Sequence, residues 1–306
     1  MKNLRIVSFL PAATEMVFAL GLGDNLAGVS HECDFPPQAK QKPIVVKPAL
    51  ALDKMTLREI DIAVAERIGS GQSLYQVDEI LLRGLKPDLI VTQNLCQVCA
   101  PSGNELTVAL KTLGSKPEIV WMSPHSIEEI FQNILELGRA TNRLREAEKI
   151  ISECRARLEK ISSQTKNLSR PKIFCVEWAD PVYCAGHWVP EMVEIAGGVD
   201  ELARKGTDSV RIKWDGVRKY APEILILSPC GFHLAQALEQ ISILKSLPGW
   251  AEIPAVRNGK VFCADANSYF ARPGPRVVEG TELLAHLIHP ELFGWNGPTN
   301  AFQRVP

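Results

Sequence analysis

Short apolar runs alternate with longer amphipathic segments along the chain. Each apolar run stops at Pro, Gly or a polar loop, which is typical of buried strands, whereas the amphipathic segments have the period of helices. In the first part of the chain the apolar runs predict strands at Leu4–Phe9, Leu26–Ser30, Pro87–Thr92 and Glu118–Met122. The amphipathic segments predict helices at Thr14–Leu20, Thr56–Arg67, Val77–Leu85 and about Gly103–Leu113. Alternating strands and helices favour a parallel sheet covered by helices on both faces.

The next segment, from Ser126 to about Ile161, is helical in composition. Ser126 and Glu129 have the spacing of a capping box, and the pattern is interrupted near Gly138–Asn142. Arg143–Lys160 carries dense mixed charge and, as one helix, would span ~27 Å. Two interpretations stay open: a solvated surface helix, or a rigid strut between two lobes with little hinge motion. A new strand is predicted at Lys172–Val176.

The C-terminal half of the chain resembles the first part in the order of its motifs, although the spacings differ. Glu15–Gly21 has a counterpart in Glu191–Gly197, and Lys86–Thr92 has one in Ala221–Leu227. This pseudo-repeat predicts two similar α/β lobes with parallel sheets, joined by one long helix. The predicted domains are residues 1–125, residues 126–165 and residues 166–306. Ligands of open α/β sheets bind beyond the carboxyl ends of the strands, which would place a ligand in a cleft between the lobes.

Composition narrows the classes of function. The 306 residues carry 34 Lys and Arg against 35 Asp and Glu, a net charge of −1, which argues against non-specific nucleic-acid binding. No apolar run reaches the ~18 residues of a membrane span, so no membrane insertion is expected. The first residues do not have the pattern of a secretory signal, which predicts a cytoplasmic protein without a disulfide framework for its eight cysteines. A periplasmic or cell-surface location is expected instead if the true start lies upstream.

Candidate site residues lie in the loops that come after the predicted strands, where binding residues concentrate. Trp178, Trp188 and Tyr269 would offer apolar faces, while Glu177 and Arg272 would pair with polar ligand edges. The full set of candidate ligand-binding residues is Pro11, Thr14, His31, Glu32, Cys33, Cys96, Cys99, Glu177, Trp178, His187, Trp188, Tyr269 and Arg272.

The pair Cys96-x-x-Cys99 has three interpretations. With His31 and Cys33 it would complete a four-ligand zinc or iron site. Its position between a strand and a helix also suits a thiol–disulfide centre, because a helix N-terminus lowers the pKa of a thiol. The third interpretation is that the two thiols line a pocket or the core. The chain has no P-loop, no Gly-x-Ser-x-Gly and no His-Glu-x-x-His motif.

Several motifs occur in an order that resembles a known family. The segments that carry the resemblance are Ser8–Glu15, Gly28–Ser30, Asp34–Ala39, Lys86–Ile90, Phe174–Gly198 and Tyr269–Arg276. Together they resemble the cobalamin-binding proteins of ABC importers, within the larger iron-siderophore and cobalamin substrate-binding family. The resemblance covers nearly the whole chain. The chain departs from the family pattern at His31-Glu32-Cys33 and at the loop with Cys96 and Cys99.

The resemblance implies two Rossmann-like lobes and a non-catalytic monomer that binds a corrinoid or a related metal chelate. Such a protein requires no cofactor beyond its ligand. Zinc or iron bound at His31, Cys33, Cys96 and Cys99 would be compatible with this function. The resemblance also implies docking to an ABC permease through one acidic residue per lobe, for which Glu79 and Asp215 are the nearest matches. The alternatives are a cytosolic metal- or thiol-dependent enzyme that uses the His31 and cysteine cluster, and a cytosolic carrier without a transporter.

Overall fold

The structure is a computed structural model that describes residues 4–51, 55–93, 113 and 116–306. The chain divides into two compact units, which are described one by one. The N-terminal unit contains residues 1–124 and 128–152, and the C-terminal unit contains residues 125–127 and 153–306. Among the helices of the described residues, none combines the length and the apolar character that crossing a membrane requires.

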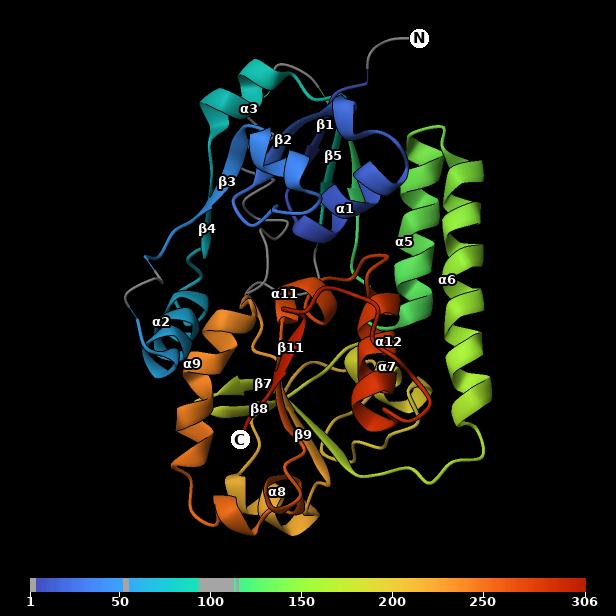
Figure 1. The fold of residues 1–306 in the computed structure, drawn as a ribbon. Helices are drawn as coiled ribbons and strands as arrows, with labels where there is room; N and C mark the ends of the chain where they lie inside the picture. Colours follow the sequence, from blue (N-terminus) through green and yellow to red (C-terminus); the bar gives the residue numbers. More distant parts are fainter. Residues whose placement is uncertain (1–3, 52–54, 94–112, 114–115) are drawn as a thin grey trace. The chain divides into compact units, whose positions relative to one another are not determined.

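The N-terminal unit is built on a six-stranded sheet with the order β4-β3-β2-β1-β5-β6 (Figure 1). Its strands are β1 (Ile6–Ser8), β2 (Leu26–Ser30), β3 (Ile44–Pro48), β4 (Tyr75–Val77), β5 (Leu89–Thr92) and β6 (Glu118–Trp121). Its elements with helical backbone include α1 (Pro11–Ala19), η1 (Gly23–Asn25), η2 (Pro37–Gln41), α2 (Leu57–Gly69), α3 (Glu79–Leu85) and α5 (Ile127–Ala140). Strands β1 and β5 are fully buried and form the core of the sheet.

This sheet is mixed, which corrects the expectation of purely parallel sheets. Strand β4 runs antiparallel to β3, and the other pairs are parallel. The predicted helix at Val77–Leu85 is shortened because the side chain of Asp78 accepts a hydrogen bond from the Leu81 N–H at 2.9 Å and caps α3 there. Helix α1 begins at Pro11, earlier than the predicted Thr14, because proline is compatible with the first turn of a helix.

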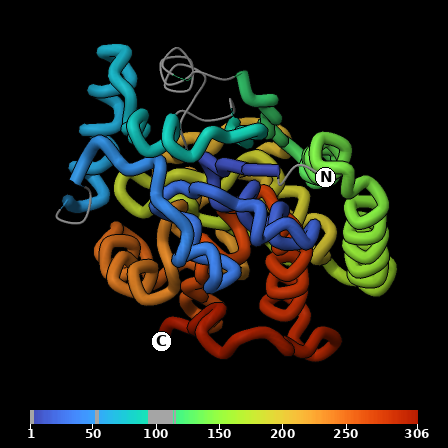
Figure 2. Tube along the Cα trace, turned by 90° about the horizontal axis from the view of Figure 1, so that it is seen from above, coloured from blue at the N-terminus to red at the C-terminus, as the bar shows by residue number. Residues whose placement is uncertain are grey.

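The C-terminal unit has a five-stranded sheet with the order β11-β10-β9-β7-β8. Its strands are β7 (Ile173–Ala179), β8 (Val182–Cys184), β9 (Ile224–Leu227), β10 (Val261–Ala264) and β11 (Phe302–Arg304), of which β8 and β11 are antiparallel edge strands. Its helical elements include α7 (Val189–Ile195), α8 (Trp214–Tyr220), α9 (Leu234–Lys245), η4 (Trp250–Glu252), α10 (Pro254–Arg257), α11 (Ala266–Tyr269) and α12 (Val277–Ile288). Helices α7 and α12 pack against each other (Figures 1 and 2).

The pseudo-repeat is visible in the backbone of each unit. Helices α3 and α8 both end at a non-glycine residue in the left-handed conformation, Lys86 with φ 47° and Ala221 with φ 54°. Two residues later, Asp88 accepts a side-chain hydrogen bond from the Arg5 N–H at 2.9 Å, and Glu223 accepts one from the Lys172 N–H, also at 2.9 Å. The same combination of a left-handed residue and a side-chain hydrogen bond therefore precedes β5 beside β1 and β9 beside β7.

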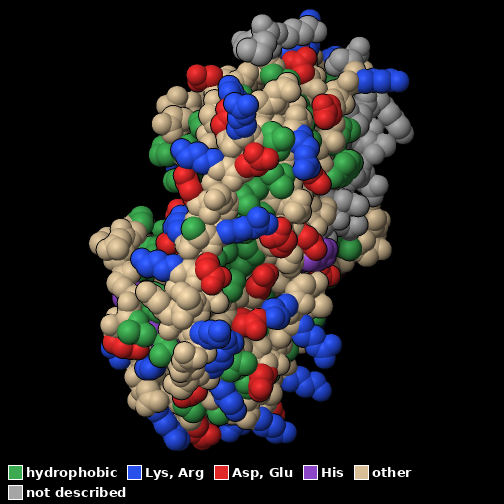
Figure 3. Space-filling model, turned by 90° about the vertical axis from the view of Figure 1, so that its right-hand side faces the viewer, with side chains coloured by type: hydrophobic (Ala, Val, Ile, Leu, Met, Phe, Trp, Pro, Cys, Tyr) green, Lys and Arg blue, Asp and Glu red, His purple; other side chains and the backbone are tan. Residues whose placement is uncertain are grey.

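Helix α6 (Leu144–Thr165) comes after α5 and the predicted interruption, at which Asn142 has φ 56°. The division between the two units falls inside α6, between Ser152 and Glu153. One side of α6 is buried, with Ala147, Ile151, Cys154, Leu158 and Ile161 at helical spacing. The face of the molecule drawn in Figure 3 shows acidic and basic side chains interspersed. The helix is thus solvated on one side, and its role as a rigid strut stays a prediction.

Candidate ligand-binding site

Three loops of the C-terminal unit lie at the carboxyl ends of β7, β9 and β10 and are tied together by hydrogen bonds. The Cys230 N–H donates to the Glu177 carbonyl oxygen at 3.2 Å, which joins the loop after β9 to the end of β7. The Asn267 side chain donates from Nδ2 to the Gly231 carbonyl oxygen at 3.0 Å, and the Asn267 N–H donates to the Phe232 carbonyl oxygen at 3.2 Å. The three loops therefore form one fixed surface at the place where open sheets bind ligands.

Two aromatic side chains stand on this surface. The rings of Trp178 and Phe232 lie with their centroids 5.6 Å apart and tilted by 51°, and both side chains are half-buried. Trp178 was among the residues predicted from the sequence, whereas Phe232 was missed. Its signal was the pseudo-repeat, since the loop after β9 corresponds to the loop that carries Cys96. A half-buried aromatic pair offers apolar faces to a flat ligand.

A histidine–aspartate pair lies next to the aromatic pair in sequence. Nδ1 of His233 is 3.0 Å and 3.1 Å from the two carboxylate oxygens of Asp265, which is itself buried. Asp265 also accepts from the Ser268 N–H at 2.9 Å and caps α11. The pair fixes the start of α9 to the start of α11, and no motif in the sequence predicts it.

Glu177 lies within β7, close to the end of the strand. Its carboxylate accepts from the Ser209 hydroxyl at 2.7 Å, and the backbone of Gly186 also bonds to it. Burial raises the pKa of Glu177 above its ordinary value, and these two hydrogen bonds partly oppose that shift because they favour the ionised form. The polar role expected for Glu177 is thus directed at Ser209 in this structure.

His187 has a special backbone conformation, with φ 54°. Its ring is stacked near that of His125, with centroids 5.8 Å apart and an interplanar angle of 29°. Burial lowers the pKa of His187, while the nearby carboxylate of Asp208 opposes that shift. His187 therefore tends toward the neutral imidazole, which is the form that can ligate a metal.

Three residues that are predicted to contact the ligand are buried in the C-terminal unit. Trp188 is 5% exposed, and its indole N–H donates to the Phe270 carbonyl oxygen at 2.9 Å. Tyr269 is buried with its ring edge-on to Trp295, and Arg272 is buried as well. All three side chains are therefore largely covered by protein, and their contact with a ligand stays a prediction.

In the N-terminal unit, the predicted residues near β1 and β2 form an internal cluster. The Thr14 hydroxyl donates to the Cys33 sulfur at 3.0 Å, and the Ser30 hydroxyl lies 3.3 Å from the same atom. Cys33 is 4% exposed, and Pro11 and Thr14 are also buried, so contact of these three residues with a ligand stays a prediction. The thiol acts as a small buried group with hydrogen-bond partners.

His31 and Glu32 are only half-buried and stay accessible. Nε2 of His31 lies 3.7 Å from a carboxylate oxygen of Glu32, and the His31 ring is 6.2 Å from that of Tyr75. Cys96 and Cys99 lie outside the described residues, so the four-residue metal site stays a prediction. Within the described residues, no group of three potential metal ligands contains His31 or Cys33.

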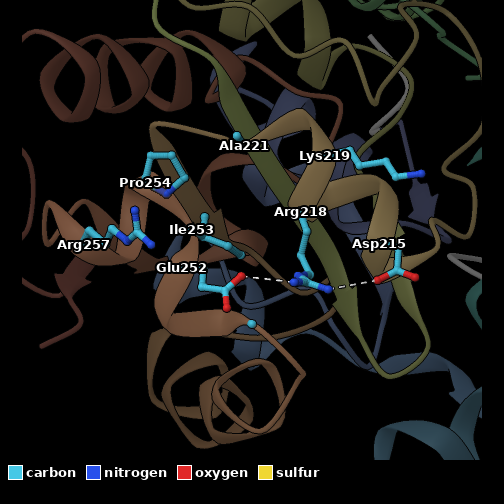
Figure 4. A pocket seen from close by; sticks show the side chains of 9 residues that line it. Asp215, Arg218, Lys219, Ala221, Glu252, Ile253, Pro254 and Arg257 are labelled. Carbon is cyan, nitrogen blue, oxygen red and sulfur yellow. Dashed lines mark hydrogen bonds and ion pairs between the residues drawn. The ribbon is translucent and has the colours of Figure 1, made fainter.

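The two predicted docking residues both lie at the beginning of a short helix. Asp215, in α8, is 79% exposed, and its carboxylate is 3.4 Å from the Arg218 guanidinium. Arg218 also contacts Glu252 at 3.1 Å, beside a shallow cavity of about 600 Å³ (Figure 4). Glu79 is the first residue of α3. When Lys86 is matched with Ala221, the counterpart of Asp215 is not Glu79 but Ile80, whose side chain is 83% exposed.

The sequence is similar to several characterised and uncharacterised proteins. A family model described as "Periplasmic binding protein" matches residues 6–268. The chain is 26% identical over 285 residues to the vitamin B12-binding protein of Vibrio cholerae, with 92% of this chain and 87% of that protein covered. It is 25% identical to the uncharacterized ABC transporter substrate-binding lipoprotein YvrC of Bacillus subtilis, with 94% of this chain and 81% of that protein covered.

Solved structures show the same fold. The periplasmic vitamin B12 binding protein BtuF of Vibrio cholerae has a TM-score of 0.65 and 24% identity, and the alignment covers 94% of this chain and 97% of that chain. IsdE of S. aureus, complexed with heme, has a TM-score of 0.69 and 16% identity, with 94% and 99% covered. The family resemblance inferred from the motifs is thus confirmed: the chain belongs to the periplasmic binding protein family, and it is a binding protein rather than an enzyme.

Proposed function

We propose that this protein is the substrate-binding component of an ABC-type uptake system and that its ligand is a corrinoid or a related tetrapyrrole chelate. Relatives named for vitamin B12 binding and for heme binding support this ligand class. The observation that carries the proposal is the half-buried pair of Trp178 and Phe232 on the surface formed by the loops after β7, β9 and β10. A broad planar ligand buries apolar area against such a pair.

The N-terminal unit would contribute polar contacts. His31 and Glu32 lie at the carboxyl end of β2, next to Tyr75, and are accessible enough to reach amide or carboxylate groups at a ligand edge. Placement of the ligand between the two lobes stays a prediction from the sequence. The enzyme alternative has no support from the comparisons, and the same holds for the predicted cytoplasmic location, because the named relatives are periplasmic proteins or lipoproteins.

Docking to a permease would use Asp215 in the C-terminal unit. Its carboxylate is exposed, and its contact with Arg218 is long enough to be exchanged for an arginine of a partner. Glu79 stays the nearest acidic residue at the start of α3, although Ile80 occupies the position equivalent to Asp215. We therefore expect docking in which the C-terminal unit carries the stronger charged contact.

Calorimetric titration of the protein with cyanocobalamin and, separately, with hemin tests the proposal. Replacing Trp178 or Phe232 by Ala should weaken binding by ~1–3 kcal/mol through lost apolar contact. Trp250→Ala is the matched control, because Trp250 belongs to a different aromatic pair, with Trp214 near α8. Failure of both probes to bind would contradict the proposed ligand class, and equal losses in all three variants would contradict the role of the aromatic pair.

A further inference from the structure

Two histidines and one aspartate meet in the C-terminal unit. One potential ligand atom of each residue, two imidazole nitrogens and a carboxylate oxygen, lies within 4.8 Å of the others in the group of His125, His187 and Asp208. We propose that these three residues bind one divalent transition-metal ion, and that this ion is distinct from any metal inside the ligand of the protein. Two imidazoles and a carboxylate form a donor set that zinc, cobalt and nickel accept.

The backbone hydrogen bonds around His187 hold two of the proposed metal ligands, His187 and Asp208, close to each other. The His187 N–H donates to the Thr207 carbonyl oxygen at 2.6 Å, and the His187 carbonyl oxygen accepts from the Gly206 N–H at 2.9 Å. A Cβ at Gly186 would lie 2.5 Å from the Ser209 nitrogen, so only glycine permits this approach. As a result, Nε2 of His187 lies 3.2 Å from Oδ1 of Asp208.

The third ligand is attached to the same region by a separate contact. His125 precedes α5, and the N–H of Ile127 donates to a carboxylate oxygen of Glu191 at 2.9 Å. Glu191 belongs to α7, which begins two residues after His187. This contact holds the segment of His125 beside His187, and the imidazole rings of the two residues are stacked.

The 3.2 Å between Nε2 of His187 and Oδ1 of Asp208 is already close to the spacing of two ligand atoms around a bound ion. In a tetrahedral zinc site with bonds of about 2.0–2.1 Å, neighbouring ligand atoms are about 3.3 Å apart, which small side-chain rotations would give here. Asp208 is 78% exposed, so solvent can supply the remaining ligand. A simple ion pair would explain why His187 and Asp208 are close to each other. It would not explain why His125 also lies near the same carboxylate. Preassembled ligands from three hydrogen-bonded segments are what a metal site needs.

The test is zinc binding by the protein after treatment with a chelator, measured by calorimetry. The three ligand variants are His125→Gln, His187→Asn and Asp208→Asn. Asparagine is chosen at position 187 because it tolerates a positive φ. Asp24→Asn, at an exposed position, is the matched control. The double variant Cys96→Ser/Cys99→Ser separates this site from zinc bound by those thiols.

We expect one equivalent of zinc to bind in the wild type, in the control and in the double cysteine variant. Each ligand variant should lose at least about tenfold in affinity, with an unchanged circular dichroism spectrum. Cobalt at this site should show no thiolate-to-metal charge-transfer band. The proposal is overturned if no zinc binds, if His187→Asn and Asp208→Asn bind as the wild type does, or if binding disappears only in the double cysteine variant.

Discussion

Asp200 allows the pH dependence of stability to be predicted with its sign. The carboxylate lies beside β7, where it accepts from the Cys175 N–H at 3.1 Å and, through its other oxygen, from the Leu202 N–H at 3.1 Å. Burial raises its pKa from 3.8 to about 6, although hydrogen bonds from the backbone of Cys175, Leu202 and Ala203 oppose the shift. The cost of desolvating the charge therefore exceeds the gain from the hydrogen bonds.

The sign of the pH dependence follows from the difference in proton binding at Asp200 between the folded and the unfolded state. Between pH 3.8 and about 6 the folded protein holds a proton on Asp200 that the unfolded chain has released, so the contribution of Asp200 to the free energy of unfolding falls as the pH rises through this window. Above that window the full penalty of about 3 kcal/mol is present, because one pKa unit corresponds to about 1.4 kcal/mol. The neutral variant Asp200→Asn does not have this penalty.

The measurement is urea unfolding of the wild type and of Asp200→Asn across pH. The stability of the variant relative to the wild type should increase by about 2 kcal/mol between about pH 4.5 and about pH 7.5. Asparagine offers one acceptor oxygen to the three backbone N–H groups, which adds a constant loss that does not alter this trend. Asp24→Asn, at an exposed position, serves as the control. A relative stability that decreases with pH would show that the backbone hydrogen bonds outweigh burial and would refute the reasoning.

Two further predictions concern positions that the fold explains. Trp188→Ala should lower the free energy of unfolding by ~3–5 kcal/mol in urea melts, since the indole is buried and hydrogen-bonded; weaker ligand binding without loss of stability would place the indole in the site. Ala221→Gly should raise the melting temperature by relieving a left-handed non-glycine residue, a gain of ~1 kcal/mol; a lower melting temperature would contradict this explanation.

The sequence predicted the central strands because their apolar runs are continuous and sharply bounded. Strand β2 has the predicted bounds, Leu26–Ser30, and the repeat of Lys86–Thr92 in Ala221–Leu227 reproduces the turn before β5 and β9. The antiparallel pair of β3 and β4 was missed because the patterns of both strands are weak. Strand β3 has only two buried residues and ends at Pro48, and β4 has three residues, one of which was assigned to the following helix.

The burial of the candidate site residues could be predicted less well than the fold, because loop residues do not reveal their burial through periodicity. Trp178 lies near the end of β7 and Trp188 directly precedes α7, yet the first is half-buried and the second is buried with its indole N–H hydrogen-bonded. The difference depends on which segment returns to cover each ring. Trp188 donates to the carbonyl oxygen of Phe270, which is 82 residues away in the sequence.

The pseudo-repeat determines the fold of each unit, but it does not determine the side chains that bind the ligand. The Asp88 and Glu223 hydrogen bonds set two pairs of strands in the same way, so each unit presents loops at equivalent strand ends. The loops themselves differ between the units. After β2, the Cys33 thiol is buried and hydrogen-bonded to Thr14 and Ser30. At the ends of β7 and β9, the rings of Trp178 and Phe232 are half-buried. Backbone geometry is conferred by the repeat, and ligand chemistry is conferred by side chains that the repeat does not constrain. Substitutions at Trp178 or Phe232 should therefore change which chelate binds while leaving both sheets intact.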